Sequence, residues 1–214
     1  MPGENVLPTH IRAVLLDFGG VIAEEGFQNG LHYLAETQQL DADEVMDAGR
    51  EAVYDSGYVT GTGSEADFWA LLRQRTGITG DDEHLTRDIL DRFIIRPWVI
   101  EYVRRLHAAG FITAILSDQT DWLERLDKQF HFTDDFDQIF NSYRLGKSKR
   151  DPGLFDDVIK ALGIMPGEAL FIDDDASHVR RARDRGLWAI RFKTREDFHA
   201  RLRALPRELA IPVD

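Results

Sequence analysis

The feature that most constrains the fold of this chain is a set of four short apolar runs, widely separated along the sequence. They cover residues 13–16, 112–116, 169–172 and 187–190, and a fifth, weaker run covers residues 138–140. The four strong runs have the length of a strand and are apolar on both faces, which is typical of strands buried inside a parallel sheet. We therefore expect a sheet assembled from distant parts of the chain.

Helical patterns lie between the apolar runs. After Pro97, which suits a first helical turn, apolar side chains recur at a spacing of about 3.6 residues until Gly110. Pro152 opens a second pattern of this kind, which ends at Gly163. Strands that alternate with helices predict an α/β fold, a Rossmann-like doubly wound parallel sheet.

One interval interrupts this alternation. Residues 24–96 contain no convincing strand, and their apolar spacing indicates several helices. A helical insertion after the first strand is the simplest explanation. We expect an α/β core formed by residues 1–23 and 97–214, and a small α-helical cap formed by residues 24–96.

Charge and composition exclude several classes of function. There are 26 lysines and arginines against 38 aspartates and glutamates, so the net charge is −12, and we expect no nucleic acid partner. No apolar run could span a bilayer and the first ten residues lack the apolar stretch of a signal peptide, so we expect no membrane association and a cytoplasmic location. Zero cysteines exclude disulfides and cysteine nucleophiles. The oligomeric state stays open.

Polar side chains follow the apolar runs where ligands bind in open α/β sheets, beyond the carboxyl ends of the strands. Asp17 follows the first run, Ser117 and Asp118 follow the second, and three aspartates occupy positions 173–175. A helix N-cap accounts for one of these three aspartates but not for all of them. Carboxylates gathered at one edge repel one another unless a cation lies between them, and oxygen ligands favour Mg²⁺.

Four motifs containing these residues resemble those of the haloacid dehalogenase superfamily. The segment DFGGV at 17–21 resembles the first motif, whose leading aspartate attacks phosphorus, and Ser117 matches the hydroxyl of the second motif. The segment GKSKRDP at 146–152 resembles the third motif and places its functional lysine at Lys149. The segment FIDD at 171–174 resembles the fourth motif, an acidic pair that holds Mg²⁺. The motifs occur in the family's order, and the helical insertion fits the family's first type of cap.

The resemblance implies a catalytic nucleophile and a metal site. Asp17 would form an aspartyl-phosphate, which splits hydrolysis into two easier displacements. Mg²⁺ would be held by Asp17, by the backbone carbonyl of Gly19 and by Asp174, with Asp173 acting through water.

The resemblance also implies a phosphate-binding set. Lys149 would neutralise the oxygens of the nucleophile and of the phosphate, although Lys147 competes for this role. Gly20, Ser117 and Asp118 would join Lys149 in binding the substrate.

The sequence departs from the family at three positions. Gly19 stands where most phosphatases of the family have an aspartate that serves as general acid and base, and losing a proton donor costs about 10² to 10⁴ in rate. A branch with the pattern Asp-x-Gly, which includes a bacterial glucose-1-phosphate phosphatase, shares this glycine. Glu24 and Glu25 are the nearest candidates for a surrogate acid. Arg150 replaces the usual proline, and Asp118 replaces the asparagine usual in that branch.

We expect a Mg²⁺-dependent phosphatase that acts on a small phosphorylated metabolite, for example a sugar phosphate. One alternative is a metal-independent 2-haloacid dehalogenase, although those enzymes lack the paired acids at 173–174. Another is a catalytically weak binding module with this fold, which Gly19 alone supports. Substrate specificity would come from cap residues, among them Glu24, Phe27, Tyr54, Tyr58 and Trp69.

Overall fold

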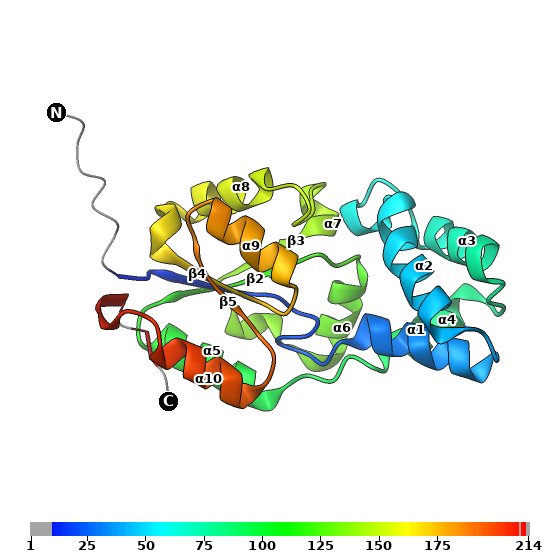
Figure 1. Cartoon of the computed structure of the whole chain (residues 1–214), viewed down its shortest axis with the longest axis horizontal. Coiled ribbons are helices and arrows are strands. Elements are labelled where there is room, and N and C mark those ends of the chain that lie inside the picture. The colour runs from blue at the N-terminus through cyan, green and yellow to red at the C-terminus, as the bar shows by residue number, and fades with distance from the viewer. Residues whose placement is uncertain (1–9, 210, 213–214) are drawn as a thin grey trace.

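The computed structural model describes residues 10–209 and 211–212, and a five-stranded parallel sheet with the order β3-β2-β1-β4-β5 lies at its centre (Figure 1). The strands are β1 (Ala13–Leu16), β2 (Ile112–Ser117), β3 (Gln138–Asn141), β4 (Ala169–Asp173) and β5 (Trp188–Arg191). Each apolar run of the sequence, including the weak fifth, contributes one strand. The predicted Rossmann-like α/β fold is confirmed.

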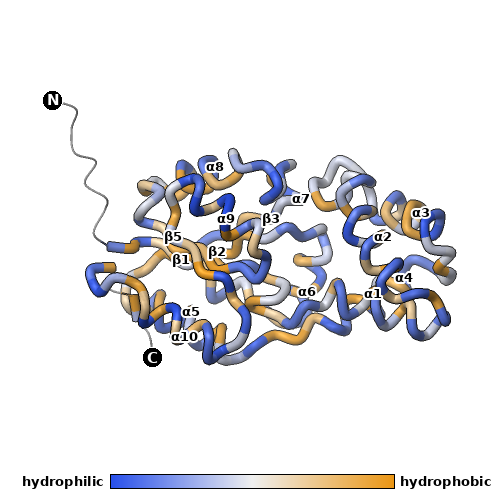
Figure 2. The backbone as a smooth tube through the Cα atoms, in the orientation of Figure 1, coloured by the Kyte–Doolittle hydropathy of each residue, from blue (hydrophilic) through white to orange (hydrophobic). Residues whose placement is uncertain are grey.

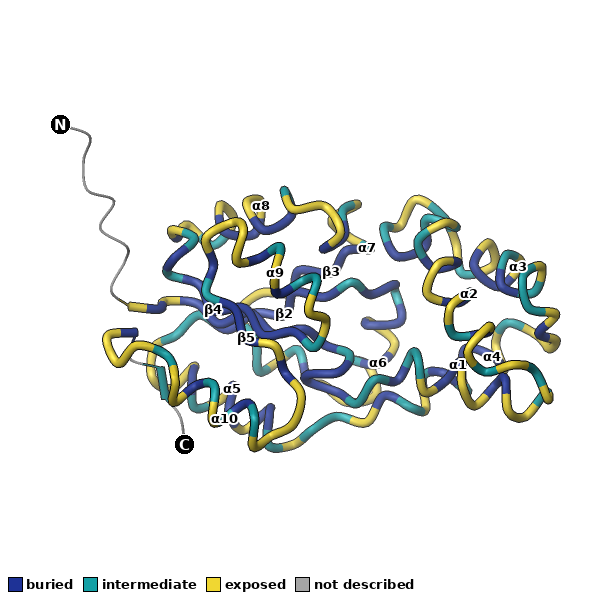
Figure 3. The backbone as a smooth tube through the Cα atoms, in the orientation of Figure 1, coloured by how far each residue is buried: buried dark blue, intermediate teal, exposed yellow. Residues whose placement is uncertain are grey.

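Helices cover both faces of the sheet. Val14 and Leu16 of β1 pack in one apolar cluster, while Ala13 and Leu15 pack in a second cluster on the opposite face. The first cluster includes α5 (Pro97–Ala108), α6 (Trp122–Phe130) and α10 (Arg195–Arg203), and the second includes α8 (Gly153–Leu162) and α9 (Ala176–Asp184). Figure 2 shows the apolar residues gathered along the strands, and Figure 3 shows the same strands buried. Burial on both faces explains why the runs are apolar at nearly every position.

The segment after β1 forms a separate group of helices beyond the carboxyl edge of the sheet (Figure 1). This helical cap contains α1 (Gly26–Thr37), α2 (Ala42–Asp55), α3 (Glu65–Thr76) and α4 (Asp82–Leu90), with a short 3₁₀ turn, η1 (Tyr58–Thr60), after α2. The remaining short elements are η2 (Thr133–Asp135), α7 (Ser142–Leu145), η3 (Pro166–Glu168) and η4 (Arg207–Leu209). Within the described residues, no helix has the length and apolarity to cross a membrane.

Polar contacts hold the helical cap against the core. Glu65 at the start of α3 accepts hydrogen bonds from the Trp122 indole at 2.9 Å and from the Arg125 guanidinium at 2.6 Å. The Ser142 hydroxyl donates to the Val59 carbonyl oxygen at 2.7 Å. These contacts bring the cap over the edge of the sheet where the strands end.

Arg96, at the point where the chain returns from the cap to the core, holds the loop that follows β1. Its Nη1 donates to the carbonyl oxygens of Gly20, Val21 and Ala23 at 2.6, 2.8 and 2.8 Å. The guanidinium also pairs with the Glu24 carboxylate at 2.8 Å, and the Arg96 side chain is only 17% exposed. One side chain therefore fixes the first cap linker and the loop behind the site described below. The motif analysis did not single it out.

Replacing Arg96 by methionine should destabilise the protein, because three carbonyl groups and the Glu24 carboxylate lose their donor. We expect the free energy of unfolding to fall by about 2 kcal/mol. The control is Arg185→Met, which removes the exposed Arg185–Asp156 ion pair and should change stability by less than about 0.5 kcal/mol. Urea unfolding of both variants measures the difference, and equal effects would contradict this account.

Candidate active site

The Asp17 carboxylate is held in one orientation directly after β1. The Asp17 backbone amide donates to the Ile172 carbonyl oxygen at 2.9 Å, which continues the pairing of β1 with β4. Its Oδ1 accepts hydrogen bonds from the Ser117 hydroxyl and from the Phe18 amide, both at 2.7 Å. The two central strand pairs therefore determine where this carboxylate lies and which way it points.

The Lys149 ammonium lies between two carboxylates. Its Nζ is 2.8 Å from Asp17 Oδ2 and 2.6 Å from Asp173 Oδ2, and the residue is 1% exposed. Lys147, the competing lysine of the motif, instead pairs with the half-exposed Asp157 at 2.5 Å. The structure thus places Lys149, and not Lys147, against the predicted nucleophile.

Three carboxylates meet at this edge of the sheet. Asp17, Asp173 and Asp174 each offer one oxygen, and these oxygens lie within 4.8 Å of one another. Burial raises the pKa of Asp17 to about 7, although the Lys149 charge opposes this shift. Burial and the charges of Asp17 and Asp173 raise the pKa of Asp174 to about 7. Burial would also raise the pKa of Asp173, but Lys149 and His178 together outweigh it and hold that pKa well below its usual range.

These acids fit a hard divalent cation, and the two neighbours differ in how they could bind it. Asp173 is fully buried, and both of its oxygens are occupied, Oδ2 by Lys149 and Oδ1 by the Asp175 amide at 2.7 Å. Asp174 lines the cavity, and its own backbone carbonyl accepts from Arg191 Nε at 2.9 Å. A cation in the cavity would therefore meet Asp174 directly and Asp173 less directly.

Two glycines bring backbone close to these acids. Gly20 has a φ of +78°, and a Cβ there would lie 2.5 Å from the Asp174 carboxyl carbon. Only glycine combines this left-handed backbone with such a close approach. Gly20 is buried and is not among the residues that line the cavity, so its predicted contact with substrate stays a prediction. Gly19 does line the cavity, and a Cβ there would lie 3.2 Å from Glu25 Oε2.

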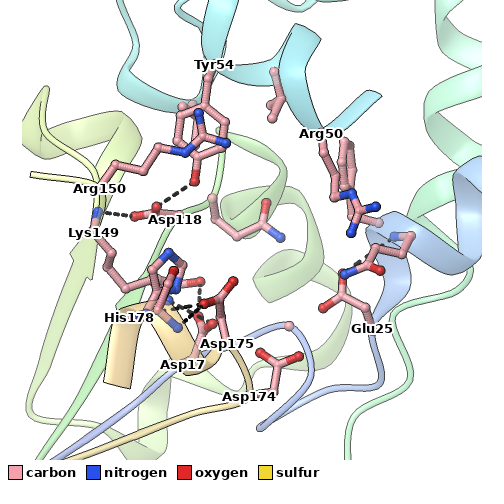
Figure 4. Close-up of a pocket in the computed structure, with 18 of the residues that line it drawn as sticks. Asp17, Glu25, Arg50, Tyr54, Asp118, Lys149, Arg150, Asp174, Asp175 and His178 are labelled. Carbon is pink, nitrogen blue, oxygen red and sulfur yellow. Dashed lines mark hydrogen bonds and ion pairs between the residues drawn. The ribbon is translucent and has the colours of Figure 1, made fainter. Parts of the chain in front are cut away.

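A cavity of about 820 Å³ opens between the edge of the sheet and the helical cap (Figure 4). Core residues that line it include Asp17, Gly19, Ser117, Asp118, Lys149 and Asp174, and cap residues include Phe27, Arg50, Val53, Tyr54 and Val59. Its size is that of a small-molecule site.

The structure divides the five cap residues that we expected to determine specificity. Phe27 and Tyr54 line the cavity. Tyr58 and Trp69 are instead buried and take no part in the cavity lining, and Glu24 pairs with the guanidinium of Arg96. An orientation of this kind depends on how the helices pack, which the apolar spacing of a single sequence does not determine.

The motif analysis did not assign other cavity residues to the site. The lining includes Arg50 of α2, and His178 and Arg180 of α9. His178 Nδ1 lies 3.3 Å from Asp173 Oδ2. Only the α9 residues carried a usable signal, because that helix begins immediately after the aspartates at 173–175 and its first turns must lie at the same edge.

Residues 11–184 match the family model of the haloacid dehalogenase-like hydrolases. The chain belongs to this family. It is 30% identical over 106 residues to rat bifunctional epoxide hydrolase 2, a match that spans 46% of this chain but only 19% of that protein. It is 22% identical over 202 residues to the D-ribitol-5-phosphate phosphatase of Bacteroides thetaiotaomicron, which covers 82% of this chain and 89% of that one.

Solved structures of this family share the fold. A haloacid dehalogenase family enzyme of Bacteroides thetaiotaomicron, in complex with magnesium and inorganic phosphate, superposes with a TM-score of 0.63 at 22% identity, over 86% of this chain and 94% of that one. The L-2-haloacid dehalogenase of Xanthobacter autotrophicus, with chloropropionic acid covalently bound, superposes with a TM-score of 0.62 at 20% identity, over 93% and 86%. At these identities the likeness concerns the fold alone, so this hydrolase must be assigned a reaction from its own residues.

The different surroundings of the two acids predict different consequences of removing them. Asp174→Ala should weaken Mg²⁺ binding more than Asp173→Ala, because Asp174 faces the cavity. Asp173→Ala should instead lower the free energy of unfolding by about 3 kcal/mol, because the buried Lys149 ammonium loses a partner. Calorimetric titration with Mg²⁺ and urea unfolding of both variants test this, and the opposite order of Mg²⁺ affinities would reverse the assignment.

Proposed function

We propose that this hydrolase is a Mg²⁺-dependent phosphatase that acts on a small phosphorylated metabolite through an aspartyl-phosphate on Asp17. The observation that carries the proposal is the position of the Asp17 carboxylate, which contacts a buried ammonium and a buried hydroxyl and adjoins an acidic pair in one cavity. Asp17 would attack phosphorus, and the P–O bond to the alcohol would break. Water would then release phosphate and regenerate the carboxylate.

Each neighbouring residue has a role in this proposal. The Ser117 hydroxyl and the Phe18 amide hold Oδ1, and Lys149 offsets the charge of Asp17 and of the incoming phosphoryl oxygens. Asp17, Asp174 and the Gly19 carbonyl would hold Mg²⁺, which supplies further charge neutralisation when it is bound. We propose that residues 24–96 act as the cap that covers this site.

The cavity and the charge of the chain favour a small substrate over a polymer. A cavity of about 820 Å³ accommodates a sugar-sized molecule, and the net charge of −12 disfavours nucleic acid. The similarity to a D-ribitol-5-phosphate phosphatase supports a phosphorylated polyol or sugar. The Asp-x-Gly pattern at 17–19 supports the branch that includes a glucose-1-phosphate phosphatase.

The two alternative functions fit the site less well. A metal-independent dehalogenase has no use for Asp174, a third carboxylate whose pKa is raised by burial and by its acidic neighbours. A binding module without catalysis does not need Asp17 and Lys149 in direct contact. Dependence of turnover on Mg²⁺ separates the three functions.

Removing the proposed nucleophile should abolish turnover and leave the fold intact. We expect Asp17→Asn to lower kcat on an aryl phosphate at least about 10³-fold, since no other carboxylate can form the covalent intermediate. Asp156→Asn, a change of equal charge on the core surface, is the control. Assays with and without Mg²⁺ measure the effect, and more than about a tenth of wild-type activity in Asp17→Asn would rule out the covalent mechanism.

The missing general acid has one well-placed substitute. Glu24 is engaged by Arg96, whereas Glu25 lines the cavity beside Gly19, in the space that a side chain at position 19 would enter. Burial, reinforced by the charge of Asp174, raises the pKa of Glu25 to about 7. We propose that Glu25 donates the proton to the departing alkoxide.

The test of Glu25 compares leaving groups that need protonation to depart with leaving groups that do not. Glu25→Gln should lower turnover of alkyl phosphates by about 10² and of aryl phosphates much less, because a phenolate departs without protonation. Glu24→Gln is the control. Adding Gly19→Asp to Glu25→Gln should restore alkyl phosphate turnover, since the new carboxylate enters the same space. An equal loss on both kinds of ester would refute the role of Glu25.

A further inference from the structure

In Figure 4, Arg150 and Tyr54 lie at the top of the cavity, and Asp17 and Asp174 lie at its bottom. The guanidinium carbon of Arg150 lies 3.3 Å from the centre of the Tyr54 ring, and both residues line the cavity. Arg150 comes from the core loop directly after Lys149, whereas Tyr54 comes from α2 of the cap. Both partners of this stack therefore face the space in which the non-reacting part of a substrate would lie.

The tyrosine platform is itself held rigidly. The Tyr54 hydroxyl donates to Asp118 Oδ2 at 2.7 Å, and Asp118 Oδ1 accepts from the Lys149 amide at 2.7 Å. Asp118 thus links the Tyr54 side chain to the backbone of the loop that carries Lys149. A guanidinium stacked on a ring fixed in this way is pre-oriented, and stacking leaves the N–H groups in its plane available as donors.

The Arg150 guanidinium carries a positive charge without a matching carboxylate. Within residues 10–209 and 211–212 it lies in no ion pair, whereas Arg104, Arg125 and Arg144 each pair with an acid at 2.5–2.6 Å. The chain has a net charge of −12, so acidic partners are plentiful. Five arginines nevertheless line this one cavity, namely Arg50, Arg150, Arg180, Arg181 and Arg191.

We propose that Arg150 recognises a second anionic group on the substrate, at the end opposite the phosphate that is hydrolysed. A planar fork of N–H donors matches a carboxylate or a phosphate in a bidentate manner. Among phosphorylated sugars and polyols, the substrate class is then those that also carry a distal carboxylate or a second phosphate. This inference rests on the proposed phosphatase function and narrows it.

Matched substrates test the proposal. Glycerol 3-phosphate and 3-phosphoglycerate differ only in a hydroxymethyl group in place of the carboxylate, and fructose 6-phosphate and fructose 1,6-bisphosphate differ by the second phosphate. In one of the two pairs, we expect wild-type kcat/KM to be at least about 10-fold higher for the member with the distal anionic group. The pair that shows the preference identifies the distal group.

Arg150→Gln should lower kcat/KM about 10- to 100-fold for the preferred substrate with a distal anionic group. It should change kcat/KM less than about 3-fold for the partner substrate that lacks this group. Arg150→Lys, which keeps the charge but loses the fork, should fall between wild type and Arg150→Gln. The control is Arg144→Gln, which removes an arginine that lies 5.3 Å from the centre of the Tyr143 ring outside the cavity lining. It should leave the ratio within each pair unchanged.

Three outcomes would overturn the proposal. Wild-type protein could hydrolyse an aryl phosphate and show no preference within either pair, in which case the phosphatase function stands and the role of Arg150 fails. Arg150→Gln could lower kcat/KM equally for both members of a pair, which would mean that the stack only holds the cap against the core. Hydrolysis of no phosphate ester by the wild type would defeat the proposed function itself, and this inference with it.

Discussion

The rest of this site depends on the two ion pairs of the buried Lys149 ammonium. A charge with 1% exposure is tolerable only when it is paired, and Lys149 has both Asp17 and Asp173 within 2.8 Å. Asp17 follows β1, Asp173 ends β4, and the lysine comes from the loop before α8. The ion pairs therefore join the ends of two adjacent strands to a distant loop. Removing the lysine would leave two carboxylates without their cation, whereas removing either carboxylate would leave the ammonium with one partner.

One lysine cannot neutralise this cluster. Asp174 adds a third carboxylate, and the glycine at position 20 lets the backbone approach it closely. The raised pKa of Asp174 reflects burial together with the repulsion of its acidic neighbours. A divalent cation would relieve that repulsion, which connects the electrostatics of this chain to the Mg²⁺ site proposed here.

The cap is linked at two separate places to the loops that carry the proposed catalytic residues. Arg96 binds the loop after β1 to both cap linkers, while the Tyr54 hydroxyl binds Asp118, which in turn holds the Lys149 amide. Tyr54 therefore both lines the cavity and, through Asp118, helps to hold the backbone that carries Lys149. In the proposed phosphatase, this arrangement would let cap residues act on the site without touching the phosphorus atom.

The sequence by itself determined the sheet and the edge at which chemistry could occur. Apolar runs of strand length can be recognised in the sequence because burial on both faces excludes polar residues. The side chains that follow parallel strands lie at a common edge of the sheet. Asp17, Ser117 and Asp174 could be brought together on that basis. Three features were decided only by the tertiary structure: the place of Glu25, and not Glu24, in the cavity lining, the anchoring by Arg96, and the stack of Arg150 on Tyr54. Each depends on which way one side chain points across the boundary between cap and core, and no periodicity along the chain encodes that direction.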